Sequence, residues 1–173
     1  MMRSRAAVLL ALVLVVCVSP AMAAYSAFLE LGPSFKGSAN DKDHRDCIEV
    51  VSIKGPNKAN EAGPLTLQVR VDQSIPALLL AATAGTAYPI AHVDVSQTIS
   101  GTARTTLRMT LNKVVVKEVN FLIDKETDAN TPMAQVVLSY DTITWEYPDL
   151  RFDGSSGGPA VKQGWDNLNK VKI

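Results

Sequence analysis

Apolar and polar residues alternate along several stretches of this chain, and this alternation constrains the fold more than any other feature. Residues 65–72 are Leu-Thr-Leu-Gln-Val-Arg-Val-Asp, with an apolar side chain at every second position. A period of two places one set of side chains in a core and the other set in water, which is typical of a half-buried β-strand. We therefore expect a chain built mainly from strands.

The same period returns later in the sequence. Leu107, Met109 and Leu111 alternate with polar residues before the β-branched run 114–116, and a further long strand is predicted to begin at 136–140. In that last strand the apolar phase shifts to positions 143, 145 and 147, which predicts a bulge or a stretch buried on both faces. Shorter strands are predicted over 28–31, 47–53, 90–99 and 161–168.

Helix signals are concentrated in one segment. Ser74 is the predicted N-cap, Pro76 falls in the first turn, three leucines follow at 78–80, and Gly85 ends the helix. A leucine run on so short a helix predicts packing against a sheet as part of the core. The expected fold is mainly β, an antiparallel β-barrel or sandwich of two sheets with one short flanking α-helix.

The N-terminus has the pattern of a secretory signal peptide. A basic start is followed by an apolar run over 6–19 and by the small residues Ala21 and Ala23. The run is shorter than the roughly 20 residues that a bilayer-spanning helix needs, so no membrane span is predicted. We expect a signal peptide over 1–23, cleaved near Ala23, and a single domain over 24–173.

Charge argues against nucleic-acid binding. Loss of the signal peptide removes Arg3 and Arg5 from the 17 basic residues and leaves 15 against 17 acidic ones. Binding to phosphates through counterion release needs clustered Lys and Arg, whereas the two signs are interleaved here.

A glycine-rich segment at 154–159, Gly-Ser-Ser-Gly-Gly-Pro, resembles the nucleophile loop of trypsin-like proteases, with Ser156 as the attacking residue. That chemistry needs a histidine base. His44 lies in a run of alternating charge that predicts a solvated side chain, and His92 lies on the parity opposite to Val93 and Val95. Ser156 also fits a hydrolase nucleophile elbow, but the residues after it break helices. We expect a glycine turn and no enzyme.

No metal site and no cofactor are predicted. Asp41, Asp43 and Asp46 form an acidic cluster, but its spacing does not match an EF-hand loop. Cys47 is the lone cysteine of the predicted mature chain, and its apolar neighbours indicate a small buried hydrophobe.

Residues 54–64 carry no apolar periodicity and are rich in turn formers. They predict a long loop. Loops of this length inside compact domains are uncommon unless they have a function or are disordered, so this loop is a candidate contact surface.

The order and spacing of several segments resemble the haemolysin-coregulated proteins (Hcp) of type VI secretion systems. The resemblance covers nearly the whole predicted mature chain. It is carried by Phe-Leu-Glu-Leu at 28–31, Lys-Gly-Ser at 36–38, Ile-Glu-Val at 48–50, 72–78 with the Ala-Gly and Tyr-Pro pairs after it, Leu-Asn-Lys-Val at 111–114, and 157–166.

The resemblance implies a β-barrel protomer that forms a hexameric ring, with rings stacking into a tube that carries effectors. It places a subunit interface on the loop after the second strand, at Lys54, Gly55, Pro56, Asn57, Lys58, Asn60 and Glu61. It also implies that Ser156 is a spacer, because the Gly-Gly-Pro occurs in family members that are not proteases.

One feature departs from the family, whose tube subunits assemble in the cytoplasm without a cleavable signal. We therefore keep two hypotheses. The first is a tube protein, cytoplasmic before firing if the start is Met22. The second is an exported Hcp-like binding or adaptor module that acts in the periplasm or outside the cell. The signal peptide predicts an exported location.

Overall fold

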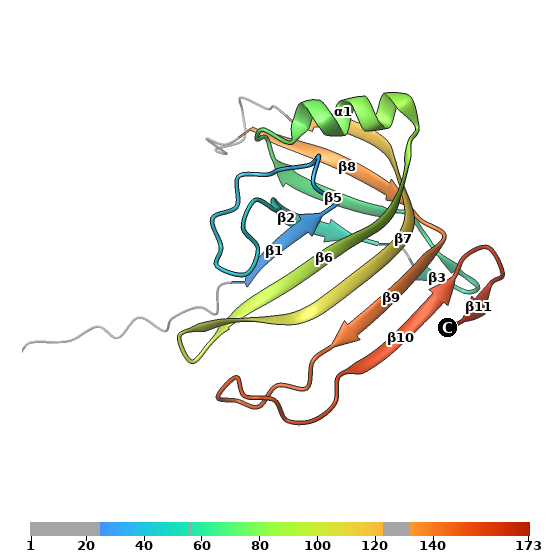
Figure 1. Cartoon of the computed structure of the whole chain (residues 1–173). Coiled ribbons are helices and arrows are strands. Elements are labelled where there is room, and N and C mark those ends of the chain that lie inside the picture. Colours follow the sequence, from blue (N-terminus) through green and yellow to red (C-terminus); the bar gives the residue numbers. More distant parts are fainter. Residues whose placement is uncertain (1–24, 56, 123–131) are drawn as a thin grey trace, which may run out of the picture.

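The computed structural model describes residues 25–55, 57–122 and 132–173 (Figure 1). The predicted signal peptide, residues 1–23, lies outside the described residues.

The alternation that predicted strands is realised most clearly in β5 (Leu65–Arg70). Leu65, Leu67 and Val69 are buried, whereas Thr66 and Gln68 are only half-buried and Arg70 is exposed. The period of two therefore separates core from surface as expected.

Six strands close into an antiparallel barrel. They follow one another around it in the order β7, β6, β1, β2, β5, β8, and β8 pairs again with β7. Their bounds are β1 (Tyr25–Glu30), β2 (Ile48–Lys54), β5, β6 (Ala87–Ile99), β7 (Thr102–Leu122) and β8 (Met133–Ser139). The mainly β fold is confirmed, and the sheet closes on itself.

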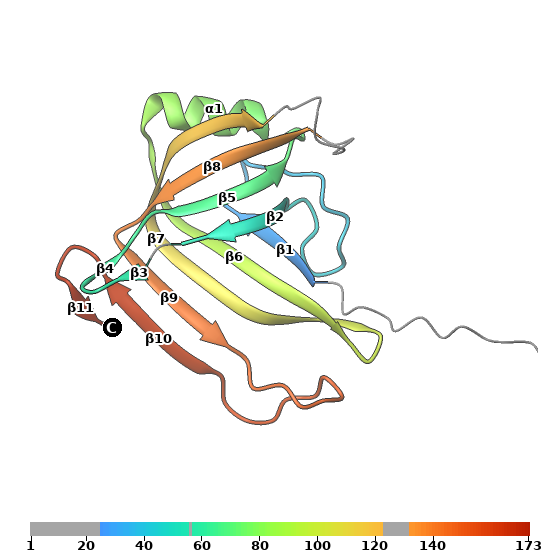
Figure 2. The same ribbon diagram turned by 180° about the vertical axis from the view of Figure 1, so that it is seen from behind.

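Within the described residues, the same sheet continues outside the barrel in three more strands: β9 (Thr142–Tyr147), β10 (Val161–Asp166) and β11 (Val171–Lys172). We call them the outer arm, which is drawn in orange and red in Figure 2. The arm joins the barrel through β7. Residues 108–112 of β7 pair with β9 of the arm, and residues 115–122 pair with β8 of the barrel.

The phase shift at 140–143 is neither a bulge nor a strand buried on both faces. The chain leaves β8 at Ser139 and starts β9 at Thr142. In β7, Lys113 lies between the residues that pair with β9 and those that pair with β8. Its φ of 51° is a left-handed conformation. The apolar positions change phase here because β8 turns its apolar side chains towards the barrel core, whereas β9 is a separate strand that belongs to the arm.

The helix α1 (Ile75–Ala84) lies against β7, along the edge of the barrel that is uppermost in Figures 1 and 2. Gly85 ends it in the left-handed conformation and donates its N–H to the Ala81 carbonyl, as predicted. Ser74 is the N-cap residue, as predicted, but its side chain makes no cap hydrogen bond, because its hydroxyl donates to Asp72 Oδ1 at 2.6 Å.

The prediction for the three leucines of α1 was partly wrong. Leu78 is fully buried, but Leu80 is 69% exposed. A helix of 10 residues can turn only one stripe towards the sheet, and consecutive positions point about 100° apart.

The core fills the barrel with aliphatic side chains, of which the largest and most completely buried include Leu29, Ile48, Leu67, Leu111 and Leu138. Burial of each such side chain stabilises the fold by about 1.5–3 kcal/mol. Over the ranges described, none of the helical structure is long and apolar enough to cross a membrane.

Candidate functional site

A small hairpin leaves the barrel between β2 and β5. It consists of β3 (Asn57–Lys58) and β4 (Glu61–Ala62), which pair only with each other. The long loop predicted over 54–64 is therefore not structureless. The turn forms because Asn60 adopts a φ of 63°, and Asn tolerates the left-handed region better than most residues.

The hairpin lies beside β11 and the end of β10 in both ribbon views (Figures 1 and 2). Trp165 of β10 lines a small pocket of about 70 Å³ together with the hairpin residues Lys58, Asn60, Glu61 and Ala62. The indole Nε1 is buried and has no hydrogen-bond partner among the residues that the structure describes. The hairpin and the outer arm thus form one end of the molecule.

Two side chains fix the hairpin to the rest of the protein. Asn167 Oδ1 accepts the N–H of Ala62 at 3.1 Å, and Asn167 Nδ2 donates to the Tyr140 carbonyl at 3.3 Å. Tyr140 Oη donates to the Gly63 carbonyl at 2.6 Å. Burial raises the pKa of this phenol to about 12, so the hydroxyl keeps its proton near neutral pH. We call these residues the Tyr140–Asn167 pair.

An open cleft of about 820 Å³ lies between the hairpin, the barrel wall and the turn that links β10 to β11. Its lining includes both members of the Tyr140–Asn167 pair. Lys117 and Lys170 border it with exposed side chains. Lys117 is at a β-bulge of β7, where the register shifts between Val116 and Glu118. The cleft therefore combines a partly apolar lining with two exposed, positively charged side chains.

The predicted interface residues are mostly gathered at this end of the molecule. Lys54 is the last residue of β2, Gly55 follows it, and Asn57 belongs to β3. Lys58, Asn60 and Glu61 are exposed on the hairpin. Pro56 lies outside the described residues. Their contact with a neighbouring subunit stays a prediction.

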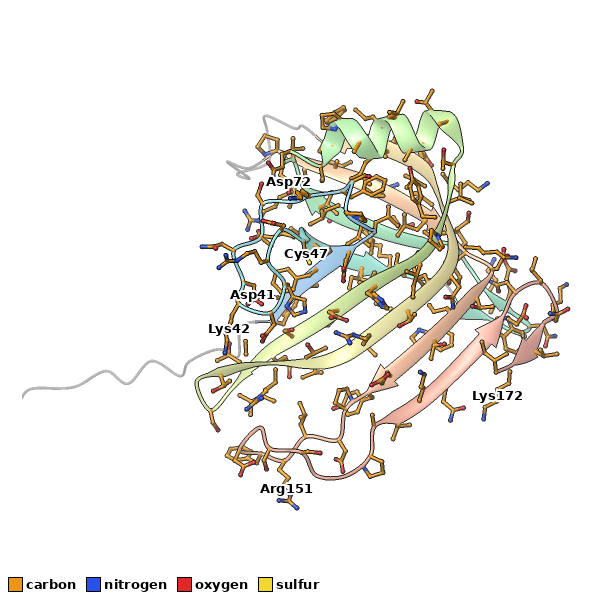
Figure 3. The ribbon with its side chains drawn as sticks, in the orientation of Figure 1. Asp41, Lys42, Cys47, Asp72, Arg151 and Lys172 are labelled. Carbon is orange, nitrogen blue, oxygen red and sulfur yellow. The ribbon has the colours of Figure 1, made fainter. Side chains whose placement is uncertain are left out.

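Ser156 lies in the connection between β9 and β10, where its hydroxyl donates to the Gly158 carbonyl at 3.1 Å. The side chain is exposed, and Ser156 makes an isolated antiparallel bridge with Leu150. Figure 3 shows Arg151 of the same connection far from Lys172 of β11. Ser156 is thus part of a turn, on geometry that agrees with the spacer interpretation.

His92 is also accounted for without Ser156. It lies on β6 opposite in parity to buried Val93, as expected, and its Nδ1 is 3.2 Å from Thr110 Oγ1. Neither of the two histidines has Ser156 among its hydrogen-bond partners within the described part of the chain.

His44 is buried, so the prediction of a solvated side chain was wrong. Only 8% of the residue is exposed, and its ring stacks on Phe28 with centroids 4.4 Å apart. Nδ1 lies 2.9 Å from Asp41 Oδ1 and Nε2 lies 3.1 Å from Asp94 Oδ2. The prediction failed because Asp94, 50 positions away, compensates for the burial.

Asp94 is the centre of this polar network. It is 4% exposed. Its Oδ1 accepts a hydrogen bond from Arg108 Nε at 2.8 Å, and its Oδ2 accepts one from Arg108 Nη2 at 2.6 Å. Burial acts to raise the pKa of the Asp94 carboxyl, but hydrogen bonds from Arg108 and His44 outweigh it and lower the pKa. The network ties the loop between β1 and β2 to the barrel wall.

The acidic cluster is used within the same loop. Asp41 Oδ1 accepts the N–H groups of Asp43 and His44 at 3.0 and 3.1 Å, whereas Asp43 and Asp46 are exposed. Cys47 is half-buried, less than predicted, and burial together with nearby carboxylates raises the pKa of its thiol to about 11. The thiol is therefore protonated at neutral pH and a weak nucleophile.

Comparison with known proteins decides the family. A family model described as "Type VI secretion system effector, Hcp" matches residues 28–147, which is well over half of the chain. The chain belongs to the Hcp family. The resemblance inferred from the sequence is thereby confirmed.

Relatives of this Hcp-family protein match over most of their length. Protein hcp1 of Pseudomonas aeruginosa is 26% identical over 164 residues, which cover 86% of this chain and 99% of that protein. The crystal structure of Hcp1 from Salmonella typhimurium has a TM-score of 0.74 at 22% identity and covers 88% of this chain and 100% of its own. Hcp1 from E. coli EAEC 042 has a TM-score of 0.61 at 25% identity, covering 80% and 96%.

Sequence patterns did not reveal how this Hcp-family protein holds its hairpin. Tyr140 was predicted only as part of a strand, and Asn167 carried no signal of its own. Asn167 is 105 positions from Ala62, and no local pattern reports a contact over that separation. The family-model match ends at residue 147, so Asn167 also lies beyond it.

Proposed function

We propose that this Hcp-family protein forms hexameric rings by head-to-tail contact, and that the rings stack into a tube that carries effectors in type VI secretion. Family membership supports the proposal. The structural observation that carries it is the projecting hairpin, which is held in a defined position at one end of the barrel.

The shape of the protomer fits such an assembly. Each strand of the closed barrel has a neighbour on both sides, so the barrel itself has no edge to offer. The hairpin and the outer arm lie outside it and present edges and exposed side chains. A contact between two different surfaces closes into a ring when the rotation per subunit fits, and it otherwise continues as a filament.

Residues 54–61 form the proposed subunit interface, with Lys58, Asn60 and Glu61 as its exposed tip. This role depends on shape and charge at a surface and needs no chemistry. On this proposal the segment around Ser156 is a turn, and the protein acts as a structural component without catalysis.

Assembly tests the proposal directly. The mature protein should run as rings in size-exclusion chromatography and show rings with a central pore in negative-stain images. Lys58→Glu should weaken stacking or ring closure, because it reverses a charge at the interface tip. Lys42→Glu makes the same charge change on the loop between β1 and β2 and serves as the matched control (Figure 3).

The opposite result favours the second candidate, an exported binding or adaptor module. A protein that remains monomeric at micromolar concentration would contradict the tube. The predicted signal peptide is the observation in favour of this alternative.

We also propose export with removal of residues 1–23, and N-terminal sequencing of protein recovered from cells tests this. A mature start at Ala24 or Tyr25, with a longer precursor, is the expected result. A start at Met22 or Ala23 without such a precursor would instead indicate a cytoplasmic tube subunit.

A further inference from the structure

Asn167 joins three parts of the chain that are far apart in sequence. Its side-chain oxygen accepts the Ala62 N–H in the hairpin, and its side-chain nitrogen donates to the Tyr140 carbonyl after β8. Its own backbone N–H donates to the Asp141 carbonyl at 2.8 Å. The amide is thus used as both donor and acceptor, which fixes its orientation.

The turn that carries Asn167 is itself held in place. Asp166 Oδ1 accepts the N–H groups of Leu168 and Asn169 at 2.8 and 2.9 Å, and Asp166 Oδ2 accepts the Asn169 side-chain amide at 2.8 Å. These bonds order the turn between β10 and β11. Asn167 therefore projects from an ordered support towards the hairpin.

The second connection comes from Tyr140. The residue is buried and its hydroxyl reaches the Gly63 carbonyl, next to the Ala62 amide that Asn167 holds. Adjacent backbone groups at the base of the hairpin are thus bound by two side chains from different elements. Each bond contributes about 0.5–1.5 kcal/mol to holding that base.

The hairpin needs such support. Its two strands have two residues each and pair only with one another. An isolated two-stranded hairpin is marginally stable at best in water. The sequence of the hairpin alone therefore does not explain why it stands in one position over the cleft.

We infer that Asn167 and Tyr140 are positioning residues that pre-organise the β3–β4 hairpin for its contact with a second copy of this chain. The inference rests on the proposed function, in which the hairpin is a subunit interface. A surface that is already ordered loses less conformational entropy when it binds, so the Tyr140–Asn167 pair raises the affinity of assembly without touching the neighbour.

Three variants of the mature protein test the inference. Asn167→Ala removes both side-chain bonds, Asn167→Asp keeps an acceptor for the Ala62 N–H, and Tyr140→Phe removes only the bond to Gly63. Asn120→Ala is the matched control, because Asn120 is exposed on β7 and its side-chain amide donates to Glu118 instead of to the hairpin. Lys58→Glu reports separately on whether the hairpin is in the contact.

Hydrogen exchange and assembly are then measured together. We expect Asn167→Ala to speed exchange of the Ala62 amide by about tenfold and to raise the protein concentration needed for assembly by a similar factor, the effect of losing roughly one or two hydrogen bonds. Asn167→Asp should restore part of the Ala62 protection. Asn120→Ala should leave both measurements unchanged, and the barrel should unfold cooperatively in every variant.

Each contrary outcome has a distinct meaning. Unchanged Ala62 exchange in Asn167→Ala would overturn the anchoring of the hairpin. Faster exchange with unchanged assembly would overturn the positioning role, even if Lys58→Glu impairs assembly. If Lys58→Glu also assembles normally, the hairpin is not in the contact, and the proposed interface fails together with the inference.

Discussion

The barrel and the hairpin are held by different kinds of interaction. In the barrel, aliphatic side chains from six strands fill one core, and each strand pairs on both sides. In the hairpin Ala62 is buried, and hydrogen bonds with Tyr140 and Asn167 hold the hairpin in place. The core therefore determines whether the protein folds, whereas polar contacts determine where its projecting surface stands.

A substitution that creates a cavity in the barrel core should have the largest effect on stability. Leu67 is fully buried in β5, and Leu67→Ala should lower the free energy of unfolding by about 2–5 kcal/mol. Urea denaturation followed by circular dichroism measures it. Leu80→Ala, on the exposed face of α1, is the control and should cost less than 1 kcal/mol or so. Equal losses in both variants would remove the distinction between core and surface on which the comparison rests.

A change in the buried polar network around Asp94 should have the next largest effect on stability. Asp94→Asn removes the charge that Arg108 and His44 share, and we expect a loss of about 2 kcal/mol in unfolding free energy. Asp43→Asn changes an exposed carboxylate in the same loop and should be close to neutral. A neutral Asp94→Asn would mean that the loop between β1 and β2 depends on packing alone.

The same network predicts a pH dependence. The ordinary pKa of an Asp carboxyl is 3.8, and in the folded protein the pKa of Asp94 lies lower because hydrogen bonds from Arg108 and His44 outweigh its burial. The stabilisation is therefore complete above pH 3.8 and is lost as the pH falls through the lowered value. Acid unfolding should be steeper in the natural protein than in Asp94→Asn, and parallel curves would contradict this assignment.

A change in the outer arm should have a comparable but more local effect. A Cβ at Gly164 would lie 2.6 Å from Ile173 Cγ1 and 3.1 Å from the Ile143 carbonyl oxygen. Gly164→Val should displace β11 and cost about 1–3 kcal/mol, as overpacking typically does. Limited proteolysis should then cut near the C-terminus while the barrel survives, and Gln163→Ala is the control. Loss of the whole barrel would show that arm and barrel fold as one cooperative unit.

The smallest effect is expected at Ser156. Its hydroxyl is exposed and bonds to the carbonyl of Gly158 two residues away. Ser156→Ala should change the unfolding free energy by less than about 0.5 kcal/mol and leave assembly and secretion unchanged. A loss of any measured activity in this variant would reopen the catalytic interpretation.

The sequence predicted the barrel well because burial in a strand leaves a local trace. The alternation in β5 and the left-handed Gly85 at the end of α1 both appear as predicted. Strand ends were less exact. The stretch predicted over 107–116 is part of a 21-residue strand, and the residues at the two ends of that strand are exposed or half-buried, so no apolar alternation marks them.

The remaining features depend on contacts between distant residues. His44 looked solvated because its neighbours are charged, yet Asp94 of strand β6 lies beside it and compensates for its burial. The break after Ser139 reflects a change from the barrel to the arm, which a shift of apolar phase does not distinguish from a bulge. The Tyr140–Asn167 pair is polar and unpatterned, so periodicity carries no information about it.

The way β11 folds back has a practical consequence for handling this protein. The backbone N–H of Ile173 donates to the Gly164 carbonyl, and its side chain lies over that glycine. An affinity tag or fluorescent fusion appended there would begin within a packed strand pair, beside the hairpin (Figure 1). A label attached through an exposed position on α1, such as Leu80, leaves that end of the molecule unencumbered.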